Sequence, residues 1–314
     1  MGPSRLYQVL LIACWFLSGA PSCEKEEELL QGPRRGASFS NAHAAGKAMP
    51  AELDEVSGIA GSLAARDLIW AHNDSGDPAR IFAMTEKGAH LGRYYLQNVK
   101  AVDWEDMASG PGPVPGKNYL YIGDIGDNAA RRAHITVYRV EEPRVDRAGE
   151  ACTDTIPEEA VQAFRLEYPG GPRDAEALIA DPLSGCLYIL TKGKSETGVY
   201  KVELPEKPAG TLLLQPAGTI PFRRITAGDI SARGDEVLVK NYNRLFYWKR
   251  EGGEPLEETF IRKARRLPYA PEPQGEALAW KKDGSGFFTL SEEALGIEAV
   301  LYRYDAKAPS RPRE

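Results

Sequence analysis

The chain of 314 residues contains only 4 cysteines and 4 histidines, has no surplus of basic residues, and has no long apolar run after its first 20 positions. Without such runs it cannot carry several membrane-spanning helices, each of which needs about 20 apolar residues. A net charge of −6 argues against a nucleic-acid-binding surface. The histidines are scattered, without a pair at metal-ligand spacing, and no G-x-S-x-G motif of a hydrolase nucleophile is present.

The first 22 residues have the features of an export signal. Arg5 precedes an apolar stretch, which is followed by small residues and then by an acidic segment. Cys23 stands where bacterial lipoproteins carry their lipidated cysteine, so the chain resembles a membrane-anchored lipoprotein of the cell envelope. Lipidation at Cys14 and ordinary secretion, or a periplasmic location, are the alternatives. Residues 23–50 are charged and then small and polar, which predicts a flexible tether.

Two cysteines, Cys152 and Cys186, lie inside the remaining chain. In an exported protein an isolated pair of this kind can form a disulfide. No CxxC spacing or nearby histidine accompanies them, so a zinc site is not indicated. The sequence leaves open a disulfide and two buried free thiols.

Internal repetition is the main structural signal. Five segments share an acidic start, an apolar run, a turn, a second apolar run and an alternating run with an aromatic residue. Their first apolar runs are centred on Ile59, Met107, Leu178, Ile230 and Leu278. Alternation with a period of two predicts β-strands. Four short strands repeated about every 50 residues predict a β-propeller.

The sequence therefore predicts an all-β protein, a propeller of five four-stranded blades over residues 51–308, followed by a disordered tail at 309–314. A sixth blade in divergent sequence and a β-sandwich are the alternatives. Residues 141–160 are expected to form an inserted loop, and residues 259–266 the fourth strand of their repeat. The last repeat lacks a fourth strand, and we expect the segment before Glu55 to supply it and close the ring.

Four segments carry a resemblance to known proteins. They read EVSGIAGS (55–62), IWAHNDSGDPARIFAM (69–84), VDWEDMA (102–108) and YLYIGDIGDNAARRAHITVYRVEEP (119–143). They resemble a family of uncharacterised exported bacterial β-propeller proteins, over nearly the whole chain after the leader. That family is loosely similar to β-propeller phytases, to phytase-related esterase-like propellers and to gluconolactonase-type lactonases. The resemblance implies the fold and export; the chemistry of the distant relatives transfers weakly, because function lies in sites and not in folds.

Acidic residues at the strand starts are the candidate metal ligands. The first strand of each propeller blade lines the central channel, so these acids are expected to meet at one mouth. Glu105, Glu176 and Glu276 share the same offset from the apolar run, while Glu55 and Asp229 are displaced by a residue or two. Converging carboxylates repel one another, and oxygen ligands of this kind suit calcium or another divalent cation. Alternatively, the same carboxylates accept backbone N–H bonds and lock the blades together without a metal.

Polar residues at the ends of the second strands complete the predicted site. The residues predicted to bind an anionic ligand are Asn73, Asp74, Lys192, Lys240 and Arg244. Those predicted to orient an attacking water are Asp124, Asp127 and His72. Lys and Arg near a bound cation suit a phosphate ester or a similar anion. Ordinary turn chemistry of Asn, Asp, Ser and Gly is the alternative.

These patterns together predict an exported propeller whose acid-lined mouth binds a divalent cation and a small anionic ligand, with metal-dependent hydrolysis of a phosphoester as its extension. One alternative is a non-catalytic binding or scaffold propeller that contacts an envelope protein. A lactonase-like hydrolase is the other. We expect a monomer that does not bind nucleic acid and that contacts the membrane only through its N-terminal lipid.

Replacing Cys23 tests the anchor. Cys23→Ser removes the thiol that would receive the lipid, so the full-length variant is expected to move from the membrane fraction to the soluble fraction after cell fractionation. Retention of Cys23→Ser in the membrane fraction would point to Cys14 or to an uncleaved leader, and Cys14→Ser in parallel separates these two.

Overall fold

The computed structural model describes residues 30, 38–147, 149–294 and 296–307. The predicted export signal at 1–22, with Cys14, lies outside the described residues, as do Cys23, much of the predicted tether and the tail at 309–314.

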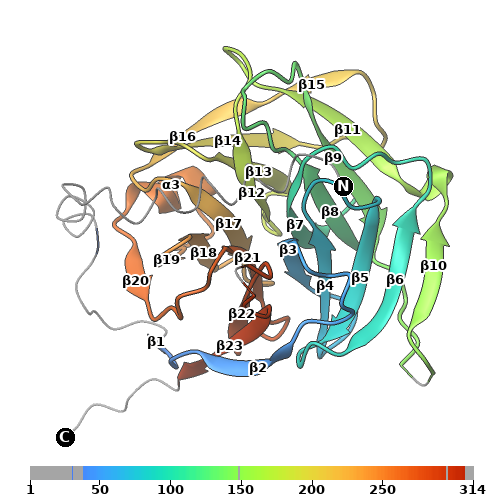
Figure 1. Ribbon diagram of the computed structural model, residues 1–314. Coiled ribbons are helices and arrows are strands. Elements are labelled where there is room, and N and C mark those ends of the chain that lie inside the picture. Colours follow the sequence, from blue (N-terminus) through green and yellow to red (C-terminus); the bar gives the residue numbers. More distant parts are fainter. Residues whose placement is uncertain (1–29, 31–37, 148, 295, 308–314) are drawn as a thin grey trace, which may run out of the picture.

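Five sheets stand around a central channel as the blades of a β-propeller (Figure 1). Their inner strands are β3 (Val56–Gly61), β7 (Trp104–Pro111), β12 (Ala175–Ala180), β17 (Ile225–Ile230) and β21 (Gly275–Trp280). Each inner strand contacts the inner strands of both neighbouring blades, so the ring is closed. The prediction of an all-β, five-bladed propeller is confirmed, and neither a sixth blade nor a sandwich occurs in the described part of the chain.

The other strands follow outward from the channel in each blade. They are β4 (Leu68–Asn73), β5 (Arg80–Thr85) and β6 (His90–Leu96) in blade 1; β8 (Asn118–Asp124), β9 (Ile135–Glu141) and β11 (Gln162–Glu167) in blade 2; β13 (Cys186–Thr191), β14 (Thr197–Glu203) and β16 (Gln215–Ile220) in blade 3; β18 (Glu236–Asn241), β19 (Leu245–Lys249) and β20 (Arg265–Leu267) in blade 4; and β22 (Gly286–Ser291) and β23 (Val300–Lys307) in blade 5. Within each blade these neighbours pair antiparallel.

The hydrophobic core is divided among the interfaces between blades. Five clusters of buried apolar side chains occur, and each joins residues of two adjacent blades. Inner strands such as β12 and β21 are buried on both faces, which explains their continuous runs of small and apolar residues. A single blade cannot cover these faces, so the closed ring is the unit that buries the core.

The N-terminal segment closes the ring. β2 (His43–Lys47) and β1 (Ser38–Phe39) both pair antiparallel with β23 in blade 5, as the sequence predicted for the segment before Glu55. The predicted tether is therefore wrong in its last part, because residues 38–39 and 43–47 form strands. Phe39 explains the difference: it is buried and lies edge-on to Phe287, with ring centroids 5.1 Å apart. One buried aromatic ring anchors a segment whose average composition is polar.

Two connections add an outer strand that the repeat pattern did not predict. Within the predicted loop at 141–160, β10 (Cys152–Ile156) pairs parallel with β6 as a fifth strand of blade 1. β15 (Thr211–Leu213) pairs parallel with β11 in blade 2 in the same way. Cys152 and Cys186 lie in different sheets and are both free thiols, so the alternative without a disulfide describes them.

A short helix replaces much of the predicted fourth strand at 259–266. α3 (Leu256–Ile261) buries Leu256, Thr259 and Phe260, the spacing of one helical face, and only β20 follows as a strand. The Phe260 ring packs against Trp248 with centroids 5.2 Å apart. No helix in the described ranges is long and apolar enough to span a bilayer.

One buried aspartate joins the inner strands of three blades. Asp106 Oδ2 accepts the N–H groups of Leu178 in blade 3 (2.9 Å) and Gly228 in blade 4 (3.3 Å), and its Oδ1 accepts the N–H of Met107 in blade 2 (2.9 Å). The side chain has no exposed surface. The predicted role of locking blades together is thus performed by a carboxylate next to the candidate ligand Glu105.

Removing this carboxylate is expected to destabilise the ring. Asp106→Ala leaves the N–H groups of Leu178 and Gly228 without an acceptor, and each unpaired buried group costs about 1–3 kcal/mol. We expect the free energy of unfolding in urea to fall by about 2–6 kcal/mol. Asp154→Ala, at an exposed position of β10, is the control and should change it by less than about 0.5 kcal/mol. Equal losses in the two variants would contradict the role of Asp106.

Candidate metal centre

A β-bulge at the same place in every blade shapes one mouth of the channel. The pairing of each inner strand with the second strand shifts by one residue near the start of the inner strand. A bulge takes one residue out of the ladder and re-aims its side chain. The residues at this bulge position are Ser57, Glu105, Glu176, Thr226 and Glu276. The shared offset of the three glutamates in the sequence thus corresponds to one structural position.

Two further positions of each blade surround the same mouth. We call the residue before the inner strand the start position and the residue after the second strand the end position. The start positions hold Glu55, Asp103, Asp174, Arg224 and Gln274, and the end positions hold Asp74, Ile125, Lys192, Tyr242 and Glu292. In blades 1, 3 and 5 the two are joined by a backbone bond from the end residue to the start residue, 2.8 to 3.2 Å long.

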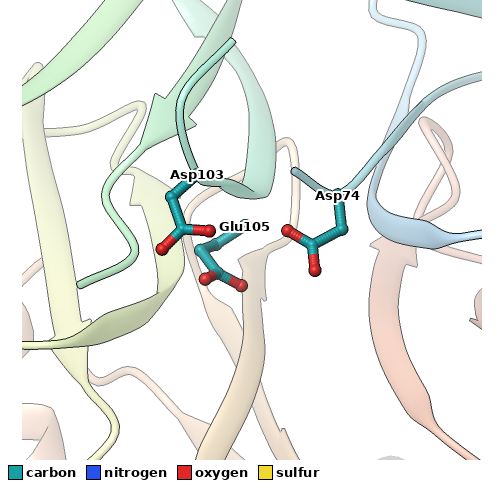
Figure 2. A group of neighbouring side chains, drawn as sticks. All are labelled: Asp74, Asp103 and Glu105. Carbon is teal, nitrogen blue, oxygen red and sulfur yellow. The ribbon is translucent and has the colours of Figure 1, made fainter. Parts of the chain in front are cut away.

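Carboxylates from blades 1, 2 and 3 converge in two overlapping groups. Oxygens of Asp74, Asp103 and Glu105 all lie within 4.8 Å of one another, and so do those of Glu105, Asp174 and Glu176. Figure 2 shows the first group, with Asp74 of blade 1 directed toward Asp103 and Glu105 of blade 2. Glu105 belongs to both groups. Several carboxylate oxygens at this spacing match the ligands that calcium and magnesium take in proteins.

Burial and mutual repulsion act on these acids. Burial, and then the neighbouring carboxylates of Glu176 and Asp74, hold the pKa of Glu105 well above its usual range. Burial, together with Glu276 and Asp103, raises the pKa of Asp74 to about 7. A bound cation would remove both costs, because it supplies the missing solvation and neutralises the repulsion.

Gly126 allows the loop after β8 to approach the carboxylates closely. A Cβ atom at this position would lie 2.1 Å from Glu105 Oε1 and 2.5 Å from Asp103 Oδ2, far inside van der Waals contact. A larger residue at this position would therefore force the carboxylates of Glu105 and Asp103 to move. The backbone of Gly126 forms one wall of the first carboxylate group.

The two aspartates predicted to orient a water instead hold this loop. Asp124 accepts the N–H groups of Val102 (3.1 Å) and Asp103 (3.2 Å) and forms a 2.7 Å ion pair with Arg132. Asp127 accepts the N–H of Arg132 at 2.7 Å. The N–H of Asp127 itself donates to Asp174 Oδ1 at 2.9 Å. Both residues thus position candidate ligands, and their oxygens are engaged in these bonds.

His72 and Asn73 also have structural contacts next to the carboxylate groups. His72 is fully buried, its Nδ1 lies 2.9 Å from the carbonyl oxygen of Asn73, and its ring packs edge-on to Trp104. Burial lowers the pKa of His72 to about 4, so the ring is neutral at physiological pH. Asn73 accepts the N–H of Glu55 (3.3 Å) and donates to the carbonyl oxygen of Glu52 (2.6 Å), which holds the turn that carries Asp74.

The three predicted cationic residues lie in different surroundings. The ammonium group of Lys192 is bonded to Glu176 in the mouth. Lys240 is fully buried; it donates to the carbonyl oxygen of Gly275 and lies 3.8 Å from Glu272, so its ammonium group is engaged inside the protein and has no exposed surface. Arg244 is half-buried at the end of the turn between β18 and β19.

The remaining predicted ligands lie outside the two groups. Glu276 accepts a 2.8 Å bond from the hydroxyl of Tyr242. Glu55 occupies a start position and not the bulge. Asp229 lies further along β17 and accepts the N–H groups of Trp280 (2.7 Å) and Ile230 (2.8 Å), which joins blades 4 and 5 in the way that Asp106 joins blades 2 to 4.

Sequence reasoning did not select three acids that face this mouth. Asp103 and Asp174 complete the two carboxylate groups. Glu292 accepts a 2.6 Å bond from Gln274 Nε2, and burial, with Glu276 and Asp74, raises its pKa to about 9. All three stand at start or end positions, so pairing the first two strands of each repeat in antiparallel register would have found them.

Comparisons with known proteins add little to this description. No family model and no curated protein matches the chain. Among solved structures it is similar to a chain in the crystal structure of a nidogen/laminin complex, with a TM-score of 0.44 and 10% sequence identity over 84% of this chain and 92% of that chain. The β-propeller assignment rests on the five sheets themselves, and the resemblance to exported bacterial propellers stays a prediction.

The raised pKa values predict how the metal-free protein responds to pH. A carboxyl group whose pKa is higher in the folded state stabilises that state while it is protonated, and the stabilisation is lost as pH rises through the folded pKa. In chelator, the free energy of unfolding should therefore fall as pH rises from about 4.5 through the values of Asp74, about 7, and Glu292, about 9. Urea titrations at a series of pH values measure this fall in the free energy of unfolding. Glu292→Gln should remove the part of the fall that occurs near pH 9. A flat profile would contradict the electrostatic description.

Proposed function

We propose that this propeller binds a divalent cation of the calcium class at its channel mouth and, through it, a small anionic ligand rich in oxygen, such as a phosphate ester. The observation that carries the proposal is that Glu105 belongs to two carboxylate groups built from three different blades. Acids brought together by three blades repel one another, which lowers the stability of the fold. A bound cation would offset this repulsion.

The donor set favours calcium over magnesium. Calcium takes six to eight oxygen ligands in flexible geometry, whereas magnesium demands a regular octahedron and keeps several waters. The two groups offer five carboxylates, Asp74, Asp103, Glu105, Asp174 and Glu176, on turns and bulges and not in one regular cage. A cation held here would leave coordination positions for oxygens of a ligand, which explains why an anion is the proposed partner.

Binding is favoured over hydrolysis by the places of the predicted catalytic residues. Asp124 and Asp127 are bonded to backbone groups and Arg132, and His72 is fully buried in the wall. None of these three side chains faces the carboxylate groups as a free acid or base. We therefore propose a binding propeller first and a metal-dependent phosphoesterase second. We also propose that the protein is exported to the cell envelope and anchored there through a lipid on Cys23.

Glu105→Gln tests the cation site. The substitution keeps the size of the side chain and removes the charge shared by both groups. We expect calorimetric titration of chelator-stripped protein to give at least about a tenfold loss of calcium affinity, equivalent to about 1.4 kcal/mol. Calcium should also raise the melting temperature of the wild type and not of the variant. Glu203→Gln, exposed at the end of β14, is the matched control and should behave as the wild type.

Two results would separate the versions of the proposal. No bound metal after purification, together with no calcium effect on melting, would remove the cation site. If calcium binds, a panel of phosphoesters and lactones distinguishes a binding protein from an enzyme. Turnover that disappears in Glu105→Gln would establish the hydrolase version, whereas turnover unchanged in that variant would show that the chemistry lies elsewhere.

A further inference from the structure

We propose that Lys192 occupies the second cation position of the mouth, so that the native protein takes one divalent cation, and that this cation and the Lys192 ammonium together receive one oxyanion group of the ligand. The inference rests on the proposed cation site and goes beyond it, because it specifies how many ions bind and which protein group completes the site.

The second carboxylate group already contains a positive charge. The Lys192 ammonium is bonded to Glu176 Oε1, and it lies 5.5 Å from the centre of the Tyr242 ring. A lysine side chain carries a positive charge at physiological pH, because its ordinary pKa is about 10.4. Lys192 therefore remains an ammonium ion on an oxygen that would otherwise bind a metal.

Matched positions of the blades show how the two groups differ. In blade 1 the end position holds Asp74, whose N–H donates to the carbonyl oxygen of Glu55 at 2.8 Å. In blade 3 the same position holds Lys192, whose N–H donates to the carbonyl oxygen of Asp174 at 3.0 Å. The backbone is thus equivalent, but Asp74 joins the acids of the next blade, whereas Lys192 is bonded to Glu176 of its own blade. The first group is therefore available to a metal cation, whereas the second group already contains the Lys192 ammonium.

Arg132 is the basic side chain that acts on the first carboxylate group, but its own hydrogen bonds go to other residues. Arg132 acts on the charge of Asp103, but its guanidinium is bonded to Asp124 at 2.7 Å and to the carbonyl oxygen of Gly126 at 2.7 Å. It supports the loop behind the carboxylates. The first group, Asp74, Asp103 and Glu105, therefore keeps the greater need for an external cation.

The position of Lys192 is held from two sides. The carbonyl oxygen of Gly193 accepts the N–H of Arg224 in blade 4 at 2.9 Å, and the N–H of Gly193 donates to the carbonyl oxygen of Thr191 at 2.9 Å. A Cβ at Gly193 would lie 1.6 Å from the carbonyl oxygen of Glu196, so the turn requires glycine there. A lysine on so tight a turn is positioned as a fixed charge and not as a mobile surface side chain.

The chemistry of the ligand follows from this arrangement. Glu105 is shared by the two groups, so a cation in the first would lie near the ammonium in the second. A phosphate or carboxylate group presents several oxygens and can contact both positive charges at once. An ammonium compound would meet like charge here.

The number of bound ions tests the proposal. Chelator-stripped wild type, titrated with calcium in a calorimeter, is expected to bind one ion per chain, and Lys192→Met two, because Glu176 becomes free to complete a second site with Glu105 and Asp174. Lys192→Arg keeps the charge and should stay at one. Lys194→Met, exposed in the same turn, is the control and should also stay at one. Inorganic phosphate, added at saturating calcium, should bind at least tenfold more weakly to Lys192→Met than to Lys194→Met.

Each departure from this pattern is informative. Two ions in the wild type, or one ion in Lys192→Met, would overturn the assignment of Lys192 while leaving a cation site in place. Equal phosphate affinity in the two methionine variants would overturn its role toward the ligand. Absence of calcium from every form would contradict the proposed function, and this inference with it.

Discussion

The carboxylate of Asp106 and its bonds to three inner strands are the constraint on which the mouth depends. Asp106 belongs to the wall, where it accepts N–H groups of blades 2, 3 and 4, and its neighbour Glu105 stands at the bulge. Two adjacent acids thus have opposite surroundings, one satisfied by the backbone and one directed to the channel opening. The bulge contributes to this difference, because it takes Glu105 out of the ladder and re-aims its side chain.

The mouth is also where like charges lie close together. Elsewhere in the described ranges, buried charges are satisfied locally, as in the pair of Arg250 and Asp181, 2.7 Å apart. At the mouth, Asp74, Asp103 and Glu105 face one another. Sequences that keep such a local conflict generally do so for function, at a cost that the rest of the fold supports. Five matched blade interfaces provide that support.

The sequence predicted repeating features better than single ones. Five blades followed from the recurrent strands, and Glu105 and Glu176 followed from their common offset. Asp229 did not lie at the matched position because the repeat of blade 4 was aligned on Ile230, whereas the residue that corresponds to Met107 and Leu178 is Gly228. A glycine there hides the register until the pairing partners are known. Lys240 looked like a ligand for an anion because burial cannot be read from a strand end. The helix α3 and the strand around Phe39 depend on single apolar residues that find partners only in three dimensions.

Closure of the ring by β1 and β2 has a consequence for how the binding site comes into being. These strands pair with β23, which is nearly the whole described chain away in sequence, and such distant pairings form late because the loop must close first. Blade 5 stands beside blade 1 (Figure 1). Asp74 of blade 1 faces the acids of blade 2 (Figure 2). A nascent chain that has not yet joined its two ends lacks the frame that sets this distance. A cation that binds these acids would therefore favour the closed ring over open forms of the chain, because ligand binding stabilises the state that holds the site.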